Sequence, residues 1–228
     1  MAVPGDAIGN LKKINSLQGL EERLEFYKTW APHHEKDIQP MEYRAPYFLA
    51  ETVAGLFEEG QQGDQRGWLL VLDAACGTGL VADEMFKFGF RQFHGVDACL
   101  PMMEVAERKG RYQKLIHGLL GNGTASLESS VYDIVVAVGA FQGGGVPWSA
   151  VPELLGALKP GGVLCFTLRG DSADFRQRSL SELQDFLDQG LLEQVTERHI
   201  PKFQRPIWEE SPEEEYIPGI VCVFRKSL

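Results

Sequence analysis

The fold of this chain is decided by one stretch, which reads Leu69-Leu70-Val71-Leu72-Asp73-Ala74-Ala75-Cys76-Gly77-Thr78-Gly79. A continuous apolar run bounded by glycine is typical of a strand buried inside a parallel sheet. The two glycines let the backbone turn sharply and let a ligand approach it closely. Residues 80–88 then carry apolar side chains at helical spacing, and Gly89 is a natural end for that helix. Strand, glycine turn and helix together predict the ligand cradle of an open α/β sheet.

A second short strand, residues 92–96, ends at an acidic residue, Asp97. An acidic side chain at this position, about twenty residues after the glycines, can accept hydrogen bonds from both hydroxyls of a ribose. The ligand is therefore expected to contain a nucleoside. The alternative is that Asp97 only caps the helix that begins near Pro101.

Two classes of ligand fit this pattern. The first is a dinucleotide, because residues 77–82 match the spacing G-x-G-x-x-A. The second is S-adenosylmethionine, which has no phosphate and carries positive charge on its ammonium and sulfonium groups. The carboxylate of Asp73 would attract that positive end, whereas it would repel a pyrophosphate. Asp73 therefore favours S-adenosylmethionine.

Three motifs resemble those of the class I S-adenosylmethionine-dependent methyltransferases: Asp73–Gly79, Gly95–Ala98 and Leu158–Gly162. The resemblance covers roughly residues 20–225, and the segments Tyr27–Ala31 and Tyr43–Pro46 strengthen it. It implies an α/β, Rossmann-like sandwich with helices on both faces of a seven-stranded, mostly parallel sheet whose last strand is antiparallel. It also implies S-adenosylmethionine as the cofactor and S-adenosylhomocysteine as the product.

The rest of the chain can be divided into elements on the same grounds. Helices are expected over residues 101–110, 152–158 and 181–190. Further strands are expected over residues 114–116, 132–138, 163–168, 192–199 and 219–224. The last two are connected without a helical crossover, so they should pair antiparallel. The intervening loop, residues 200–218, contains Trp208 and an acidic run, and either borders the substrate or extends into solvent.

About 65 residues precede the first strand. Residues 1–15 are weakly patterned and are expected to be mobile, whereas helical spacing begins at Leu17 and again near Pro46. We expect residues 1–65 to form a helical lid and residues 66–228 to form the S-adenosylmethionine-binding core, the two together making one compact domain.

The resemblance assigns roles to individual residues. Arg44 would pair with the methionyl carboxylate, and Met102 would lie against the adenine. The alternatives are that Tyr27 and Trp30 only anchor the lid helices, and that Met102 only packs in the core. The residues expected to bind the cofactor are Tyr27, Trp30, Arg44, Asp73, Ala74, Ala75, Cys76, Gly77, Thr78, Gly79, Asp97, Ala98, Met102, Leu119, Leu120, Val138 and Gly139.

Two departures from the family pattern bear on recognition. Where the family often has Gly-Asp-Ala after the third strand, this chain has Gly118-Leu119-Leu120, which leaves adenine recognition to backbone groups and apolar contact. The fourth strand lacks the Asn/Asp-Pro-Pro-Tyr motif of adenine and glutamine amino-methyltransferases. It opens instead into residues 139–145, where Phe141, with Trp148 nearby, is expected to shape a substrate pocket.

The composition limits the classes of substrate and partner that the chain is expected to bind. The formal net charge is −10 and no long Lys/Arg cluster occurs, which argues against nucleic acid as the substrate. The four cysteines are widely spaced, no signal peptide or apolar run near 18 residues is present, and a reducing compartment, cytosol or nucleus, is expected. The pair His33-His34 finds no third ligand, so no metal site is expected. We expect a monomer.

The sulfonium methyl is already a strong electrophile, so the protein mainly has to hold a nucleophile in line and exclude water. No catalytic residue can be named. The expected function is methyl transfer to a small-molecule or protein acceptor. The alternatives are a nicotinamide-dependent reductase, although the chain lacks the Tyr-x-x-x-Lys of short-chain reductases, and a module that binds S-adenosylmethionine without catalysis.

Overall fold

The computed structural model describes residues 1–3, 5–57, 65–141, 145–170, 173–206 and 215–228. Seven strands form one sheet in the order β3-β2-β1-β4-β5-β7-β6. The strands are β1 (Leu70–Ala74), β2 (Gln92–Asp97), β3 (Lys114–His117), β4 (Tyr132–Ala137), β5 (Leu158–Arg169), β6 (Leu192–Gln204) and β7 (Ile217–Lys226). Strands β1 to β5 pair in parallel, whereas β7 is antiparallel to both of its neighbours, β5 and β6. The expected sheet with an antiparallel last strand is confirmed.

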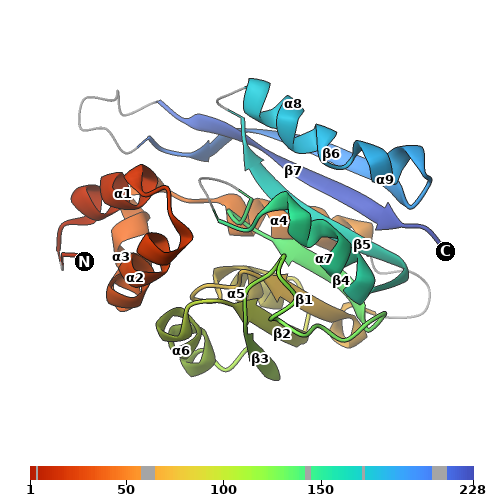
Figure 1. The fold of residues 1–228 in the computed structure, drawn as a ribbon, viewed down its shortest axis with the longest axis horizontal. Helices are drawn as coiled ribbons and strands as arrows, with labels where there is room; N and C mark the ends of the chain where they lie inside the picture. Colours follow the sequence, from red (N-terminus) through yellow and green to blue (C-terminus); the bar gives the residue numbers. More distant parts are fainter. Residues whose placement is uncertain (4, 58–64, 142–144, 171–172, 207–214) are drawn as a thin grey trace.

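Helices cover both faces of this sheet (Figure 1). The α-helices are α1 (Ala7–Ser16), α2 (Leu20–Trp30), α3 (His34–Ile38), α4 (Ala45–Leu56), α5 (Leu80–Lys87), α6 (Leu100–Arg108), α7 (Val151–Ala157), α8 (Ala173–Ser181) and α9 (Gln184–Asp188). Short 3₁₀ turns are η1 (Gln39–Met41), η2 (Arg66–Trp68) and η3 (Trp148–Ala150).

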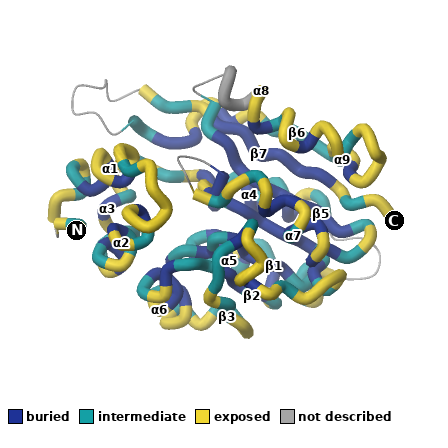
Figure 2. The backbone as a smooth tube through the Cα atoms, viewed as in Figure 1, coloured by how far each residue is buried: buried dark blue, intermediate teal, exposed yellow. Residues whose placement is uncertain are grey.

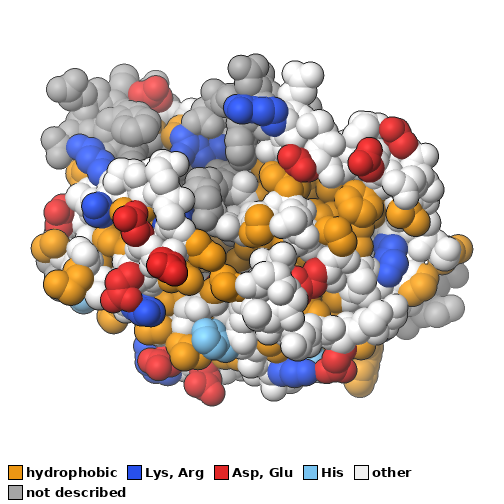
Figure 3. Space-filling view, viewed as in Figure 1, with side chains coloured by type: hydrophobic (Ala, Val, Ile, Leu, Met, Phe, Trp, Pro, Cys, Tyr) orange, Lys and Arg blue, Asp and Glu red, His pale blue; other side chains and the backbone are white. Residues whose placement is uncertain are grey.

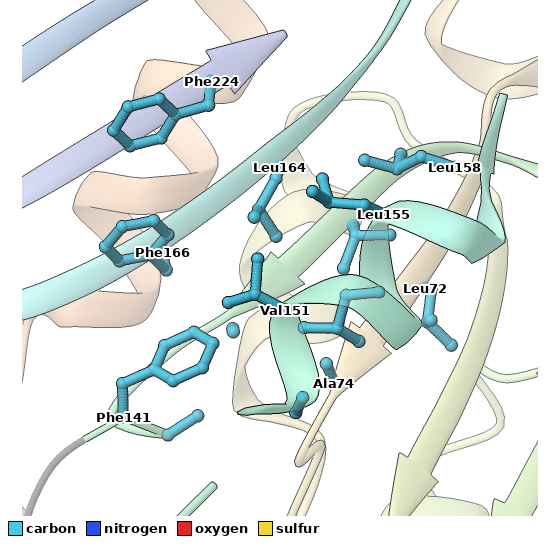
Figure 4. Packing of buried hydrophobic residues seen from close by; sticks show 14 of the residues in the cluster. Leu72, Ala74, Phe141, Val151, Leu155, Leu158, Leu164, Phe166 and Phe224 are labelled. Carbon is cyan, nitrogen blue, oxygen red and sulfur yellow. The ribbon is translucent and has the colours of Figure 1, made fainter. Parts of the chain in front are cut away.

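Alternation along the strands divides the core into two layers. Val71 faces α4 and α5, whose buried side chains include Leu49 and Met85. Leu72 faces the opposite layer, where it packs in one cluster with α7 residues such as Leu155 (Figure 4). Figure 2 shows that burial is concentrated in the central strands. Because helices cover both faces of the sheet, a ligand can reach it at the ends of the strands.

Several boundaries differ from those expected. Residues 7–16, within a segment expected to be mobile, form α1, because Asp6 caps it by accepting from the Gly9 backbone N–H at 2.9 Å. Strand β5 begins at Leu158 rather than at residue 163, since Leu158 already pairs with Tyr132. Strand β6 continues to Gln204, so only part of the expected 200–218 loop lies outside a strand, and Trp208 lies outside the described residues.

The N-terminal helices divide into two groups. Helix α4 packs into the sheet core, whereas α1, α2 and α3 form a cluster of their own around Trp30, Phe26 and Leu11. Figure 1 shows this cluster beside the sheet, with the β7 arrow pointing away from it. Because β7 runs antiparallel to β5, the parallel strands end toward the cluster.

The surface and the cysteines show nothing unusual for a globular fold. On the face drawn in Figure 3, acidic and basic side chains are interspersed, with hydrophobic side chains between them. Cys76, Cys99, Cys165 and Cys222 are all buried and unbridged. Within the described ranges, no helix is both long enough and apolar enough to span a bilayer.

Candidate functional site

A cavity of about 810 Å³ lies between the ends of the parallel strands and the N-terminal helices. Its sheet wall comes from strand ends and the turns after them: Ala75, Cys76, Gly77, Thr78, Asp97, Ala98, Val138 and Gly139. Its N-terminal wall comes from α1, α2 and α3: Leu11, Ile14, Leu20, Arg23, Leu24, Tyr27, Trp30, His34 and Ile38. Pockets that hold small molecules and cofactors have volumes of about 300–1,000 Å³. The volume of this cavity lies in the upper part of that range.

The glycine turn gives the sheet wall its shape. Gly77 has φ +53°, and no atom lies within 4 Å of the place that a Cβ would take, so a side chain there would extend into open space at the cavity. Gly79 has φ +85°, but a Cβ there would lie 3.0 Å from the Tyr112 ring. The first glycine therefore keeps the cavity open, and the second lets helix α5 pack. Ala75 also has a positive φ of 57°, a strained conformation of the kind found at ligand sites.

Asp97 is fixed at the end of β2 by the backbone around it. Its Oδ2 accepts from the Gly77 N–H and its Oδ1 from the Cys99 N–H, both at 2.8 Å. Burial raises the pKa of this carboxyl, while the backbone donors act in the opposite direction. Each oxygen keeps a lone pair for a ligand, and the side chain lines the cavity as expected.

Asp73 does not line the cavity, so its expected contact with the cofactor stays a prediction. Strand alternation turns it away from the wall, and it is 1% exposed, with Oδ2 accepting from the Tyr112 hydroxyl at 2.7 Å. Burial raises its pKa to about 7, against the lowering effect of that hydrogen bond. Ala74, fully buried in the α7 layer, and Gly79, beneath Tyr112, are likewise absent from the lining.

The N-terminal wall contains two of the three expected lid contacts. Tyr27 and Trp30 line the cavity, although Trp30 is also an anchor: its indole N–H donates to Asp37 at 2.7 Å. Arg44 does not line it, because its guanidinium lies over the Phe48 ring, 4.7 Å from the centroid. The guanidinium that does belong to this wall is that of Arg23, which donates to the Ile14 carbonyl at 2.9 Å.

The side of the cavity expected to hold adenine is apolar. Met102 on α6, with Ala98 before it, faces Leu119 and Leu120 from the turn after β3, and all four line the cavity. Met102 also packs with Ala31 and Cys99, so both of its expected roles are compatible with the structure.

The end of β4 differs from expectation. Val138 and Gly139 line the cavity, but Phe141 and Trp148 do not. Their rings stack on each other, with centroids 4.3 Å apart, and both pack against Phe166 in the core. Figure 4 shows Phe141 and Phe166 in this cluster. The structure therefore does not bring them to the cavity, and their contact with substrate stays a prediction. The glycines at 143 and 144 lie outside the described residues.

Other lining residues were not expected from the sequence: Arg23, His34, Tyr43, Asn122, Arg169 and Gln204. Burial lowers the pKa of His34 to about 4, so its imidazole is neutral at pH 7, and its Nδ1 is buried with no partner in the described part of the chain. Arg169 and Gln204 sit at the ends of β5 and β6, where strand length was underestimated. Tyr43 comes from the turn before α4, and the only signal for it in the sequence was its place at the start of the segment Tyr43–Pro46.

Comparison with known proteins shows the family to which the chain belongs. Residues 72–166 match the family described as Methyltransferase domain. The chain is 36% identical over 172 residues to methyltransferase-like protein 27 of Homo sapiens, covering 75% of this chain and 68% of that protein. The chain belongs to the class I S-adenosylmethionine-dependent methyltransferases. Its cofactor is S-adenosylmethionine, and the nicotinamide alternative finds no support.

Two further similarities agree with this family. The chain is 28% identical over 127 residues to malonyl-[acyl-carrier protein] O-methyltransferase of Halalkalibacterium halodurans, covering 54% of this chain and 47% of that protein. A methyltransferase structure from Thermotoga maritima superposes with a TM-score of 0.57 at 17% identity, covering 89% of this chain and 98% of the other. This second likeness shows that the two share the methyltransferase fold.

Proposed function

We propose that this methyltransferase binds its cofactor along the sheet wall and transfers the methyl group to a small molecule held at the ends of β4, β5 and β6. The observation that carries the proposal is the continuity of one cavity, which runs from the glycine turn to Gly139, Arg169 and Gln204. A volume of about 810 Å³ leaves room for a second small molecule beside a nucleoside cofactor.

The residues of the sheet wall fit S-adenosylmethionine. The remaining lone pairs of Asp97 suit ribose hydroxyls, and Met102 with Leu119 suits the faces of an adenine ring. The Thr78 hydroxyl is buried at the turn with no partner among the described residues, so it is available to a ligand. When bound, the cofactor supplies an electrophilic methyl group, while these side chains orient it and keep water away.

The N-terminal wall supports a small acceptor rather than a folded protein surface. Helices α1, α2 and α3 lie across the strand ends, so an acceptor has to fit beneath them. We propose that these three helices, rather than the whole of residues 1–65, act as the lid, since α4 belongs to the sheet core. A lid of this kind would close over both ligands and exclude water.

The proposal can be tested by following a labelled methyl group. Purified protein is incubated with methyl-labelled S-adenosylmethionine and a cell extract, and the extract is then separated into small molecules and protein. Label should enter the small-molecule fraction with the wild type and with Asp185→Ala, an exposed change on α9, but not with Asp97→Ala. Label in protein alone would favour a protein acceptor, and no label in any fraction would favour a non-catalytic binding module.

A further inference from the structure

The side chain of Tyr43, which is far away in the sequence, lies against the turn after β4. Gly139 has φ +65°, and its backbone N–H donates to the buried Thr167 hydroxyl at 3.1 Å, which fixes the turn against β5. A Cβ at Gly139 would lie 2.7 Å from the hydroxyl oxygen of Tyr43. The Tyr43 hydroxyl therefore stands where a side chain on residue 139 would otherwise be, and both residues line the cavity.

Tyr43 is held there by β6 rather than by the N-terminal helices. Backbone hydrogen bonds fix the chain on both sides of Tyr43. After it, the Arg44 N–H donates to the Phe203 carbonyl at 3.1 Å, and before it, the Met41 carbonyl accepts from the Arg205 N–H at 2.6 Å. The Tyr43 ring meets the Phe203 ring edge to face, with centroids 6.3 Å apart. Its hydroxyl is thus placed by the sheet and should keep its position whether or not α1–α3 move.

The hydroxyl is available to a ligand. Tyr43 is half-buried at the cavity, and in the described part of the chain its hydroxyl has no hydrogen-bond partner. Burial raises the pKa of Tyr43 far above neutrality, with a smaller contribution in the same direction from Tyr27. At pH 7 the group is a neutral phenol, which can donate and accept a hydrogen bond but cannot serve as a base.

We propose that Tyr43 is a positioning residue for methyl transfer: its hydroxyl lies beside the transferred group and holds the nucleophilic atom of the acceptor in line with it. This inference rests on the proposed function, in which transfer takes place at the end of β4. Tyr43 orients the acceptor by hydrogen bonding, and the fixed turn at Gly139 keeps the Tyr43 hydroxyl at a constant position beside the transferred group.

The test needs no knowledge of the acceptor. Sinefungin is a cofactor analogue in which an amino group replaces the transferred methyl, whereas S-adenosylhomocysteine has nothing there. Calorimetric titration gives the dissociation constants of both ligands for the wild type and for Tyr43→Phe. Loss of a hydrogen bond to the charged amino group should weaken sinefungin binding about tenfold or more and leave S-adenosylhomocysteine binding within about threefold.

Tyr47→Phe is the matched control, because it also removes one hydroxyl, here an exposed one bonded to Glu51 at 2.7 Å. It should change neither constant. The inference is overturned if Tyr43→Phe leaves the ratio of the two constants unchanged, or if it weakens both ligands equally, which would make Tyr43 a contact of the shared part of the cofactor. Failure of the wild type to bind S-adenosylhomocysteine would overturn the cofactor site itself, so the two failures are distinguishable.

Discussion

The two walls of the cavity are built by different means. In the sheet wall, neighbouring strand ends are joined by backbone donors: the Cys76 N–H bonds the Val96 carbonyl at 3.0 Å, and the Gly77 N–H bonds Asp97. In the N-terminal wall, three short helices rest on a small cluster around Trp30. The sheet wall takes its shape from the fold, whereas the N-terminal wall depends on a few side chains.

This difference bears on motion. Segments with small cores of their own open locally at lower cost than central strands. Contacts between the cluster and the sheet side include the packing of Ala31 with Cys99 and Met102, and the ion pair of Glu35 with Lys109. We therefore expect a preformed half of the site facing a half that closes on the ligand.

The largest effect is expected from the sheet wall at Asp97. Asp97→Ala removes the acceptor of two backbone N–H groups and, by our proposal, of the ribose hydroxyls. Binding of S-adenosylhomocysteine should weaken about 100-fold or more, measured by calorimetric titration. A loss of less than about fivefold in a folded variant would mean that Asp97 only caps the turn.

The two glycines of the turn after β1 should have different effects, Gly77 on ligand affinity and Gly79 on stability. Gly77→Ala places a methyl group at the open cavity and should weaken S-adenosylhomocysteine about tenfold. Gly79→Ala brings a Cβ to 3.0 Å from Tyr112 and should lower the free energy of unfolding by about 1–3 kcal/mol. Titration and thermal unfolding of both variants check this, and equal profiles for the two would contradict the division of roles.

A substitution in the N-terminal wall should act locally. Asp37 accepts from Trp30 and from Asn10, each at 2.7 Å, so Asp37→Ala leaves the buried indole N–H of Trp30 without a partner and removes one of the hydrogen bonds of the Asn10 amide. Amide exchange over residues 7–38 should accelerate, while exchange in β1 and β4 stays unchanged and ligand affinity falls about threefold to tenfold. Uniform acceleration throughout the chain would show that the two walls unfold as one unit.

The smallest effect on binding is expected behind the sheet wall, at Asp73. Its pKa rises on folding from 3.8 to about 7, so between those values the folded protein retains a proton that the unfolded chain has lost. Stability from this group therefore falls as pH rises through that window. Asp73→Asn should be more stable than the wild type at pH 8, by on the order of 1–3 kcal/mol, and similar to it near pH 4.

The same variant also tests a sequence prediction. Since Asp73 does not line the cavity, Asp73→Asn should leave the dissociation constant for S-adenosylhomocysteine within about threefold. Denaturant titrations at the two pH values and calorimetry at pH 8 provide the measurements. A large loss of affinity would instead support the predicted contact between Asp73 and the positive end of the cofactor.

The sequence predicted what local patterning controls. The apolar run, the glycine turn and Asp97 lie close together along the chain, so their spacing is sufficient to locate the sheet wall. It could not show which face Asp73 occupies, because that depends on where the strand meets its neighbours. Phe141 and Trp148 were expected near the substrate because they follow the end of the fourth strand, but their rings pack into the α7 layer.

Tyr43 is a residue of the cavity that the sequence did not predict. Its position depends on pairing with residues 203–205, about 160 positions later in the chain, and no local pattern records such a contact. Arg44, its neighbour, was favoured because a guanidinium suits a carboxylate, yet the same helix start turns that side chain onto Phe48.

The most direct test of a site shared between two walls is amide exchange of the wild type with and without S-adenosylhomocysteine. The account predicts slower exchange on binding in both walls, at residues 75–98 and at residues 7–38, with the larger change in the N-terminal helices. Protection confined to residues 75–98 would contradict it, because the N-terminal helices would then be a neighbour of the site rather than one of its walls.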